Sequence, residues 1–113
     1  MANQVKTEAH KEDAEKDWMT VKLSKAITYQ EIEVKEINLK KMEDLTAQDM
    51  NNIYDLYYAL GGNKQIMQES TLLFAQILAS QTTGYPMEVF ERMSAKDAMR
   101  LKNRVYRFFF LEA

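Results

Sequence analysis

The side chains that catalysis uses most often are scarce in this sequence. His10 is the only histidine, it lies in a polar N-terminal stretch, and there is no cysteine. A general base needs a fixed position and a tuned environment, which such a stretch does not provide. Neighbouring acids such as Glu43 and Asp44 are typical of a solvated surface, because a working carboxylate needs a strongly shifted pKa. We therefore predict no enzyme, no metal site and no cofactor.

The distribution of charge argues against nucleic acid as a partner. The chain carries 15 basic and 17 acidic side chains, a net charge of −2. Residues 1–60 hold 8 lysines and 12 acids (−4), and residues 61–113 hold 7 basic and 5 acidic groups (+2). Neither part has the basic excess that binding to nucleic acid requires, so a helix-turn-helix regulator built around residues 82–94 is a weaker alternative.

The hydrophobic pattern also argues against a membrane protein. Uninterrupted apolar runs are short, such as the four residues 108–111, and are far shorter than the roughly 20 residues of a membrane span. The N-terminus opens on polar residues and does not resemble a secretory signal. We expect a cytoplasmic protein.

Two regions differ sharply in composition near the N-terminus. Residues 1–17 are polar and charged, which predicts a flexible tail, and residues 18–113 have the size of a single domain. Apolar and polar residues alternate from Trp18 to Leu39. This alternation predicts two or three short antiparallel strands, with a turn at Gln30 and Glu31 and a bulge near Lys35.

Helical spacing of apolar residues begins after Thr46. Thr46 and Asp49 form a cap signal for a first helix, which Gly61 and Gly62 end. Asn63 is the expected cap of a second helix that contains Met67 and ends before Gly84. The apolar residues assigned to the inner side of the first helix are Met50, Ile53, Tyr54, Tyr57 and Leu60.

Two further signals complete the helical part of the chain. Pro86 follows Gly84 closely and is suited to open a short helical turn, with Tyr85 directed into the core. Ser94 and Asp97 repeat the cap signal and start a last helix that runs to about Leu111. The sequence therefore predicts an α+β fold, mainly α-helical, in which a small N-terminal antiparallel β-hairpin or meander packs on three to four helices.

The last helix carries two stripes of apolar residues. The first stripe consists of Leu101, Val105, Phe108 and Phe109, and the second of Met99, Tyr106 and Phe110. A domain of this size seldom buries both, so either the helix lies centrally in the core or one stripe contacts another protein chain. We favour the second alternative, which makes Met99, Tyr106 and Phe110 the candidate partner-binding residues. The partner bound by this stripe is either a helix of another protein or a second copy of this chain.

The order of these motifs resembles a known family. The matching segments are residues 23–27 (LSKAI), 39–41 (LKK), 46–50 (TAQDM) and 82–86 (TTGYP), followed by Ser94 and Asp97. Together they resemble the small tail assembly chaperones of long-tailed bacteriophages and their prophage relatives. The resemblance covers about residues 20–111.

The resemblance implies an α+β fold, no catalytic activity and a specific set of partners. Such chaperones bind the tape-measure protein, a long helical polypeptide that sets tail length, and keep it soluble. They also promote assembly of tail tube subunits around it. The resemblance therefore implies that the protein acts in the cytoplasm of the bacterial host and is absent from the mature virion. The alternative is a structural tail or connector subunit of the virion.

Overall fold

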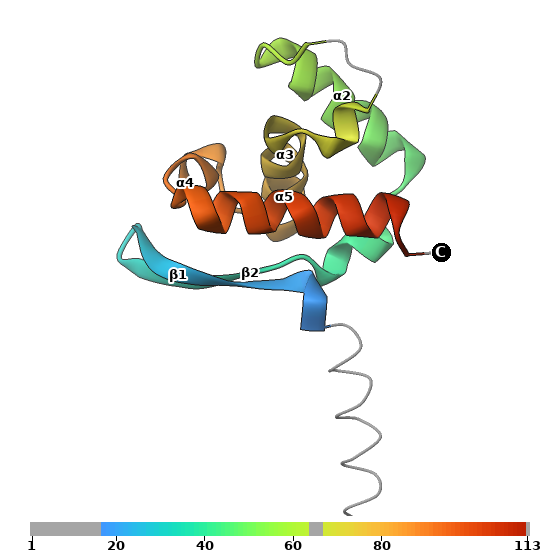
Figure 1. The fold of residues 1–113 in the computed structure, drawn as a ribbon. Helices are drawn as coiled ribbons and strands as arrows, with labels where there is room; N and C mark the ends of the chain where they lie inside the picture. The colour runs from blue at the N-terminus through green and yellow to red at the C-terminus, as the bar shows by residue number, and fades with distance from the viewer. Residues whose placement is uncertain (1–16, 64–66, 113) are drawn as a thin grey trace, which may run out of the picture.

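The computed structural model describes residues 17–63 and 67–112 (Figure 1). The tail expected over residues 1–17 lies outside this part of the chain, except for Asp17, which opens a short 3-10 turn, η1 (Asp17–Met19). The described residues are mostly helical, and a two-stranded antiparallel hairpin packs on four α-helices. The predicted α+β class is therefore confirmed, and the described strands form a hairpin, not a meander.

The hairpin joins β1 (Thr20–Tyr29) to β2 (Ile32–Asn38) through the predicted turn. Gln30 and Glu31 both have a positive φ, 47° and 66°. Two consecutive left-handed residues form the turn that matches the right-handed twist of a tight hairpin. The alternation in the sequence located this turn correctly, although neither residue is glycine or asparagine.

The irregularity in the hairpin lies on β1, opposite the residue where the bulge was expected. Lys22 pairs with Glu36 and Ile27 with Val34, so the four residues 23–26 of β1 face Lys35 alone. The extra residues take part of β1 out of the regular ladder of backbone hydrogen bonds. The backbone N–H groups of Ser24 and Lys25 are thereby available to another element.

Four α-helices cover one side of the hairpin. They are α2 (Ala47–Ala59), α3 (Leu72–Thr83), α4 (Met87–Glu91) and α5 (Ala95–Phe110). In Figure 1, α5 crosses over the hairpin, and α3 lies beyond it at a steep angle, between α4 and α2. A short 3-10 turn, η2 (Lys40–Asp44), connects the hairpin to α2 and buries Met42.

The central helix of the core is α3. It contacts α2, α4, α5 and β2, and its side chains Phe74, Ile77 and Leu78 are almost completely buried. Leu101 and Val105 of α5 have no exposed surface and belong to the same core. The last helix is thus buried on one side only, as the second of the two sequence-based alternatives for its apolar stripes requires.

The start of α3 differs from the prediction. Thr71, not Asn63, is the N-cap, and its hydroxyl accepts a hydrogen bond from the N–H of Phe74 at 3.2 Å. Met67 is exposed, and the helical turn before Thr71 is the 3-10 turn η3 (Gln68–Ser70).

Contacts with α2 explain why the helix begins late. Tyr54 donates a hydrogen bond to Glu69, and the side-chain amide of Gln68 donates one to the hydroxyl of Tyr58. Burial and the adjacent Glu69 carboxylate raise the pKa of Tyr54 to about 12, so its phenol remains a donor. These bonds hold η3 against α2, and α3 starts only after it. Leu60, the last of the apolar residues at helical spacing, is the C-cap of α2 and is 52% exposed.

The other predicted helix ends are confirmed. Thr46 and Asp49 form a reciprocal capping box, and the hydroxyl of Ser94 accepts a hydrogen bond from the N–H of Asp97. Gly84 ends α3 with a φ of 83°, and Pro86 is the N-cap of α4. Residues 82–86 therefore form a structural joint, with Tyr85 half-buried against the core.

We expect Gly84→Val to lower the free energy of unfolding by about 1–3 kcal/mol, because valine adopts a positive φ only with strain. A Cβ at this position meets no atom within 4 Å, so the loss comes from the backbone and not from a clash. Chemical denaturation measures the effect. Gly84→Asn is the matched variant and should lose less, because asparagine tolerates this conformation; equal losses in the two variants contradict the explanation.

In the hairpin turn, substitutions that favour a positive φ should stabilise the fold. Replacing Gln30 by Asn and Glu31 by Gly should raise the free energy of unfolding by about 0.5–1 kcal/mol, since both new residues accept a positive φ readily. Glu33→Gly, which places the same substitution in the extended backbone of β2, is the control and should lower it. A thermal melt that shows no gain for the turn variant contradicts the prediction.

Candidate functional site

The described residues show no group of side chains placed for a metal ion and no helix suited to span a membrane. Within residues 17–63 and 67–112, no three or more His, Cys, Asp or Glu residues are placed to hold a metal ion. No helix in the same part of the chain is long and apolar enough to cross a membrane. His10 lies outside the described residues. The most distinctive surface is the outer side of α5, together with the contacts that hold this helix on the hairpin.

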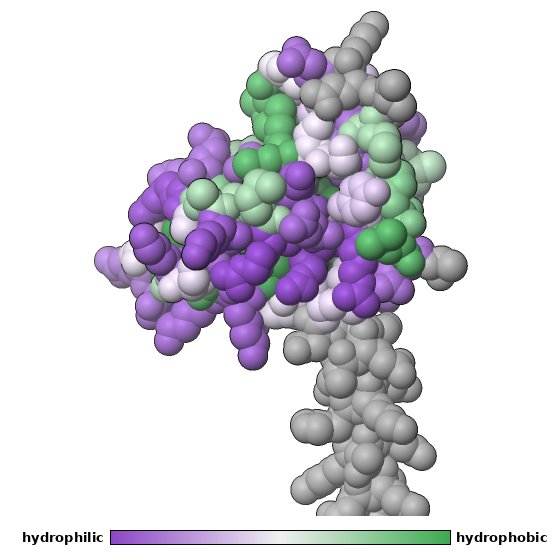
Figure 2. Space-filling model, viewed as in Figure 1, coloured by the Kyte–Doolittle hydropathy of each residue, from purple (hydrophilic) through white to green (hydrophobic). Residues whose placement is uncertain are grey.

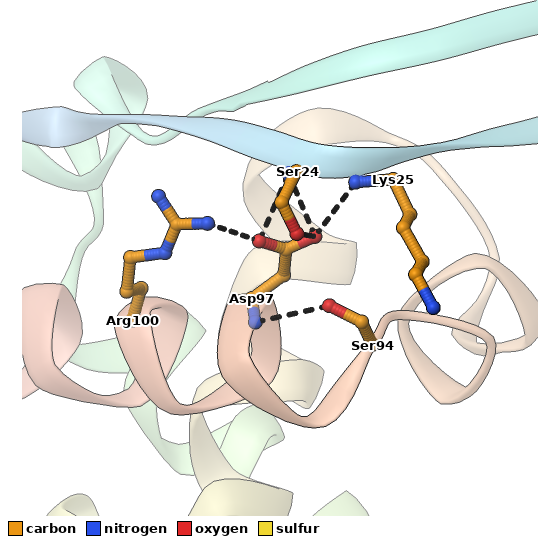
Figure 3. A network of polar contacts seen from close by, with 5 residues as sticks. All are labelled: Ser24, Lys25, Ser94, Asp97 and Arg100. Carbon is orange, nitrogen blue, oxygen red and sulfur yellow. Dashed lines mark hydrogen bonds and ion pairs between the residues drawn. The ribbon is translucent and has the colours of Figure 1, made fainter.

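A buried carboxylate fixes the N-terminal end of α5. Asp97 has no exposed surface, and its two oxygens each accept a hydrogen bond from the N–H of Ser24 at 3.0 Å (Figure 3). The hydroxyl of Ser24 and the N–H of Lys25 donate to the same carboxylate at 3.2 and 3.3 Å. Arg100, one turn further along α5, forms an ion pair with it. The irregular segment of β1 thus supplies the donors that this carboxylate needs.

These contacts determine the protonation state of Asp97. Burial by itself raises the pKa of a carboxyl group, but hydrogen bonds from Ser24 and Lys25, together with the hydroxyl of Ser94, outweigh it. The net result is a pKa lowered from 3.8 to about 2. Asp97 is therefore an ionised structural group at neutral pH. The sequence identified it only as an acid in the first turn of α5.

The C-terminal end of α5 is held by a second set of contacts. The guanidinium of Arg107 lies 4.3 Å from the ring centroid of Trp18, within the range of a cation–π interaction. Arg104 donates a hydrogen bond to the backbone carbonyl of Trp18 at 3.4 Å, and Arg107 also pairs with Glu112 at 2.6 Å. The sequence did not indicate that Trp18 contacts Arg104 and Arg107, because these residues lie more than 80 positions apart in the chain.

The structure separates the candidate binding residues into two groups. The rings of Tyr106 and Phe110 contact each other, with centroids 4.9 Å apart, and Phe110 is 42% exposed. Met99 is 46% exposed but precedes Tyr106 by two helical turns, about 10 Å along the helix axis. The side chains of Lys102 and Asn103 lie between them in sequence. The second stripe is therefore two separate apolar anchors.

The first stripe of α5 faces inward, as predicted, but its two phenylalanines are only half-buried. Phe109 packs against Phe74 of α3, with ring centroids 6.1 Å apart, and Phe108 contacts Phe109. Leu111, just beyond the helix, is another exposed apolar residue, with 68% of its surface accessible. Figure 2 shows hydrophobic residues at this end of α5 and over α2, and mainly hydrophilic residues over the rest of α5.

The exposed side of α5 is basic as well as partly apolar. Three of its five basic residues are engaged within the fold: Arg100 with Asp97, Arg104 with Trp18 and Arg107 with Glu112. Lys96 and Lys102 form no ion pair with any residue that the structure describes. The arrangement offers contacts to an apolar or acidic partner.

Comparisons with models of protein families, with curated proteins and with solved structures return no match. The function is therefore inferred from the residues and from the geometry of this surface.

The pKa of Asp97 gives a prediction with a defined sign. Because the pKa is lower in the folded chain, the carboxylate stabilises the fold above about pH 4, and this contribution is lost as the pH falls towards 2. A shift of about two units corresponds to roughly 2–3 kcal/mol. Asp97→Asn should lower the free energy of unfolding by an amount of that order at pH 7 and should reduce its decrease below pH 4.

Denaturation at several pH values between 7 and 2 measures this effect. Glu91→Gln removes an exposed carboxylate on α4 and controls for the change in net charge. If the two variants give the same stability at pH 7, Asp97 does not fix the hairpin to α5.

Proposed function

We propose that this protein is a tail assembly chaperone of a long-tailed bacteriophage or prophage. In this proposal it binds the tape-measure protein through the outer side of α5, keeps that protein soluble, and promotes assembly of tail tube subunits around it. It acts in the cytoplasm of the bacterial host and is absent from the mature virion. The sequence resemblance over residues 20–111 is the reason for naming this class of function.

The observation that carries the proposal is the exposed apolar surface at the C-terminal end of α5. The rings of Tyr106 and Phe110 contact each other there, and the exposed Leu111 follows Phe110 in the chain. The opposite side of this helix is fixed in the core by Leu101 and Val105. A long helical client presents apolar anchors at three- and four-residue spacing, and such anchors bind to apolar surfaces of this kind. A rigid helix with an exposed aromatic pair therefore suits a chaperone for a helical polypeptide.

A structural tail or connector subunit is the alternative, because such a subunit also needs exposed apolar contacts. The two functions differ in the fate of the protein after assembly. Mass spectrometry of purified virions distinguishes them: a chaperone is absent from the finished particle, and a structural subunit is present in stoichiometric amount. Its presence in that amount contradicts the chaperone proposal.

The binding surface itself is tested by replacing Tyr106 and Phe110 with serine. We expect a folded protein that no longer co-purifies with the tape-measure protein encoded in the same genome, because both rings retain exposed surface in the free chain. If both rings were fully buried in the core, their replacement would cost about 3–5 kcal/mol per ring and would unfold the domain. Circular dichroism and a pull-down measure the two properties.

The matched control replaces Leu56 and Leu60 of α2 with serine. These residues are 39% and 52% exposed, comparable to Phe110, but lie on a different helix. The control variant should still bind. A folded Tyr106 and Phe110 variant that binds as well as the parent shows that these residues are not the surface, and an unfolded one shows that they belong to the core.

A further inference from the structure

An open hollow lies beside Met99, between the irregular segment of β1 and the first two turns of α5. It has a volume of about 440 Å³ and is lined by Ser24, Ala95, Lys96, Met99 and Arg100. This volume is within the range of pockets that bind small molecules or single large side chains. The hollow exists because the hydrogen bonds between Ser24 and Asp97 hold β1 and α5 together directly below it.

The walls of this hollow are almost entirely apolar, although two of its five lining residues are basic. The walls must therefore be formed by Met99, Ala95 and the aliphatic stems of Lys96 and Arg100. Long basic side chains commonly cover apolar surface with their stems while the charged ends remain in water. The result is an apolar hollow with a cationic rim, in which the guanidinium of Arg100 is paired with Asp97 and the ammonium of Lys96 has no ion-pair partner among the described residues.

The charge around the hollow is positive. None of its lining residues is acidic. The nearby carboxylate of Asp97 is buried, accepts hydrogen bonds from Ser24 and Lys25, and forms an ion pair with Arg100. Figure 3 shows Arg100 and Lys25 on opposite sides of this carboxylate. Lys96 has no ion pair with a described residue, so its charge is available to a partner.

We propose that the hollow binds an apolar side chain of an amphipathic helix that carries carboxylates next to that side chain. This inference rests on the proposed function and deepens it: the helix belongs to the tape-measure protein. The cationic rim selects the acidic neighbours, and the apolar wall holds the side chain. Met99 and Tyr106 are seven residues apart on α5, so a client helix lying along α5 contacts the hollow and the Tyr106–Phe110 pair with residues about one heptad apart.

The chemistry of the hollow is tested with two labelled helical peptides of about 20 residues, each with leucines one heptad apart. One peptide carries glutamates beside the leucines, and the other carries lysines in their place. Fluorescence anisotropy should show about fivefold tighter binding of the acidic peptide at low salt, because Lys96, unpaired among the described residues, attracts the glutamates of one peptide and repels the lysines of the other. This preference should shrink in about 0.5 M salt, where exposed charges are screened. Equal binding of the two peptides overturns the proposal.

Three variants locate the binding site. Ala95→Trp fills the hollow without changing a charge, and Lys96→Glu reverses one charge of its rim. Both should weaken binding of the acidic peptide at least about fivefold while leaving the circular dichroism spectrum unchanged. Lys41→Glu is the control: it makes the same charge change at an exposed residue of η2, outside the hollow and outside α5, and should bind like the parent. Unchanged binding by the first two variants overturns the proposal.

Two parallel measurements separate this inference from the proposed function. If the tape-measure protein co-purifies with the parent, with Ala95→Trp and with Lys96→Glu alike, the inference fails and the proposed function stands. If the parent protein binds the acidic peptide more tightly but does not co-purify with the tape-measure protein, then the helix that binds in the hollow does not belong to the tape-measure protein. Gel filtration that shows a dimer of the parent, and a monomer for Lys96→Glu, overturns the proposal in favour of a second copy of this chain.

Discussion

The arrangement of this fold depends on the contact between one buried carboxylate and one irregular strand. An ionised carboxylate without partners is very unfavourable in a protein interior, and so are backbone N–H groups that a bulge removes from their ladder. In this chain, residues 23–26 leave the ladder of backbone hydrogen bonds. The free N–H groups of Ser24 and Lys25 then donate hydrogen bonds to the carboxylate of Asp97. Because the buried carboxylate depends on these donors, the register of the hairpin and the position of α5 are fixed together.

The consequence of this contact is an α5 that presents a defined outer side. The helix is held at its start by Asp97, along its middle by Leu101 and Val105, and near its end by the contacts of Arg104 and Arg107 with Trp18. Contacts at three points leave little freedom for the helix to rotate. Exposed apolar groups on such a helix are thus pre-organised, and a partner that binds them does not have to order them first.

The parts of the fold that were predictable from the sequence are those governed by near neighbours along the chain. The caps at Thr46 and Ser94 depend on a residue three positions later, and Gly84 depends only on its own φ. The contact between Ser24 and Asp97 joins residues 73 positions apart, and an acid in the first helical turn looks the same whether it faces water or a strand. Asn63 was the wrong cap of α3 because the bonds of η3 to Tyr54 and Tyr58, invisible in the sequence, decide where that helix starts.

The same limit applies to the candidate binding site. Helical spacing correctly separated the buried Leu101 and Val105 from the exposed Met99 and Phe110, but it treated Met99, Tyr106 and Phe110 as one continuous stripe. The structure divides this stripe into an apolar pair and a hollow with a cationic rim, separated along α5 by Lys102 and Asn103. Two small apolar areas with polar residues between them expose less contiguous apolar surface than one long stripe, which limits non-specific association. A long helix can still contact both areas at once, because residues a heptad apart lie on the same side of it. The division therefore favours a helical partner over a general apolar one.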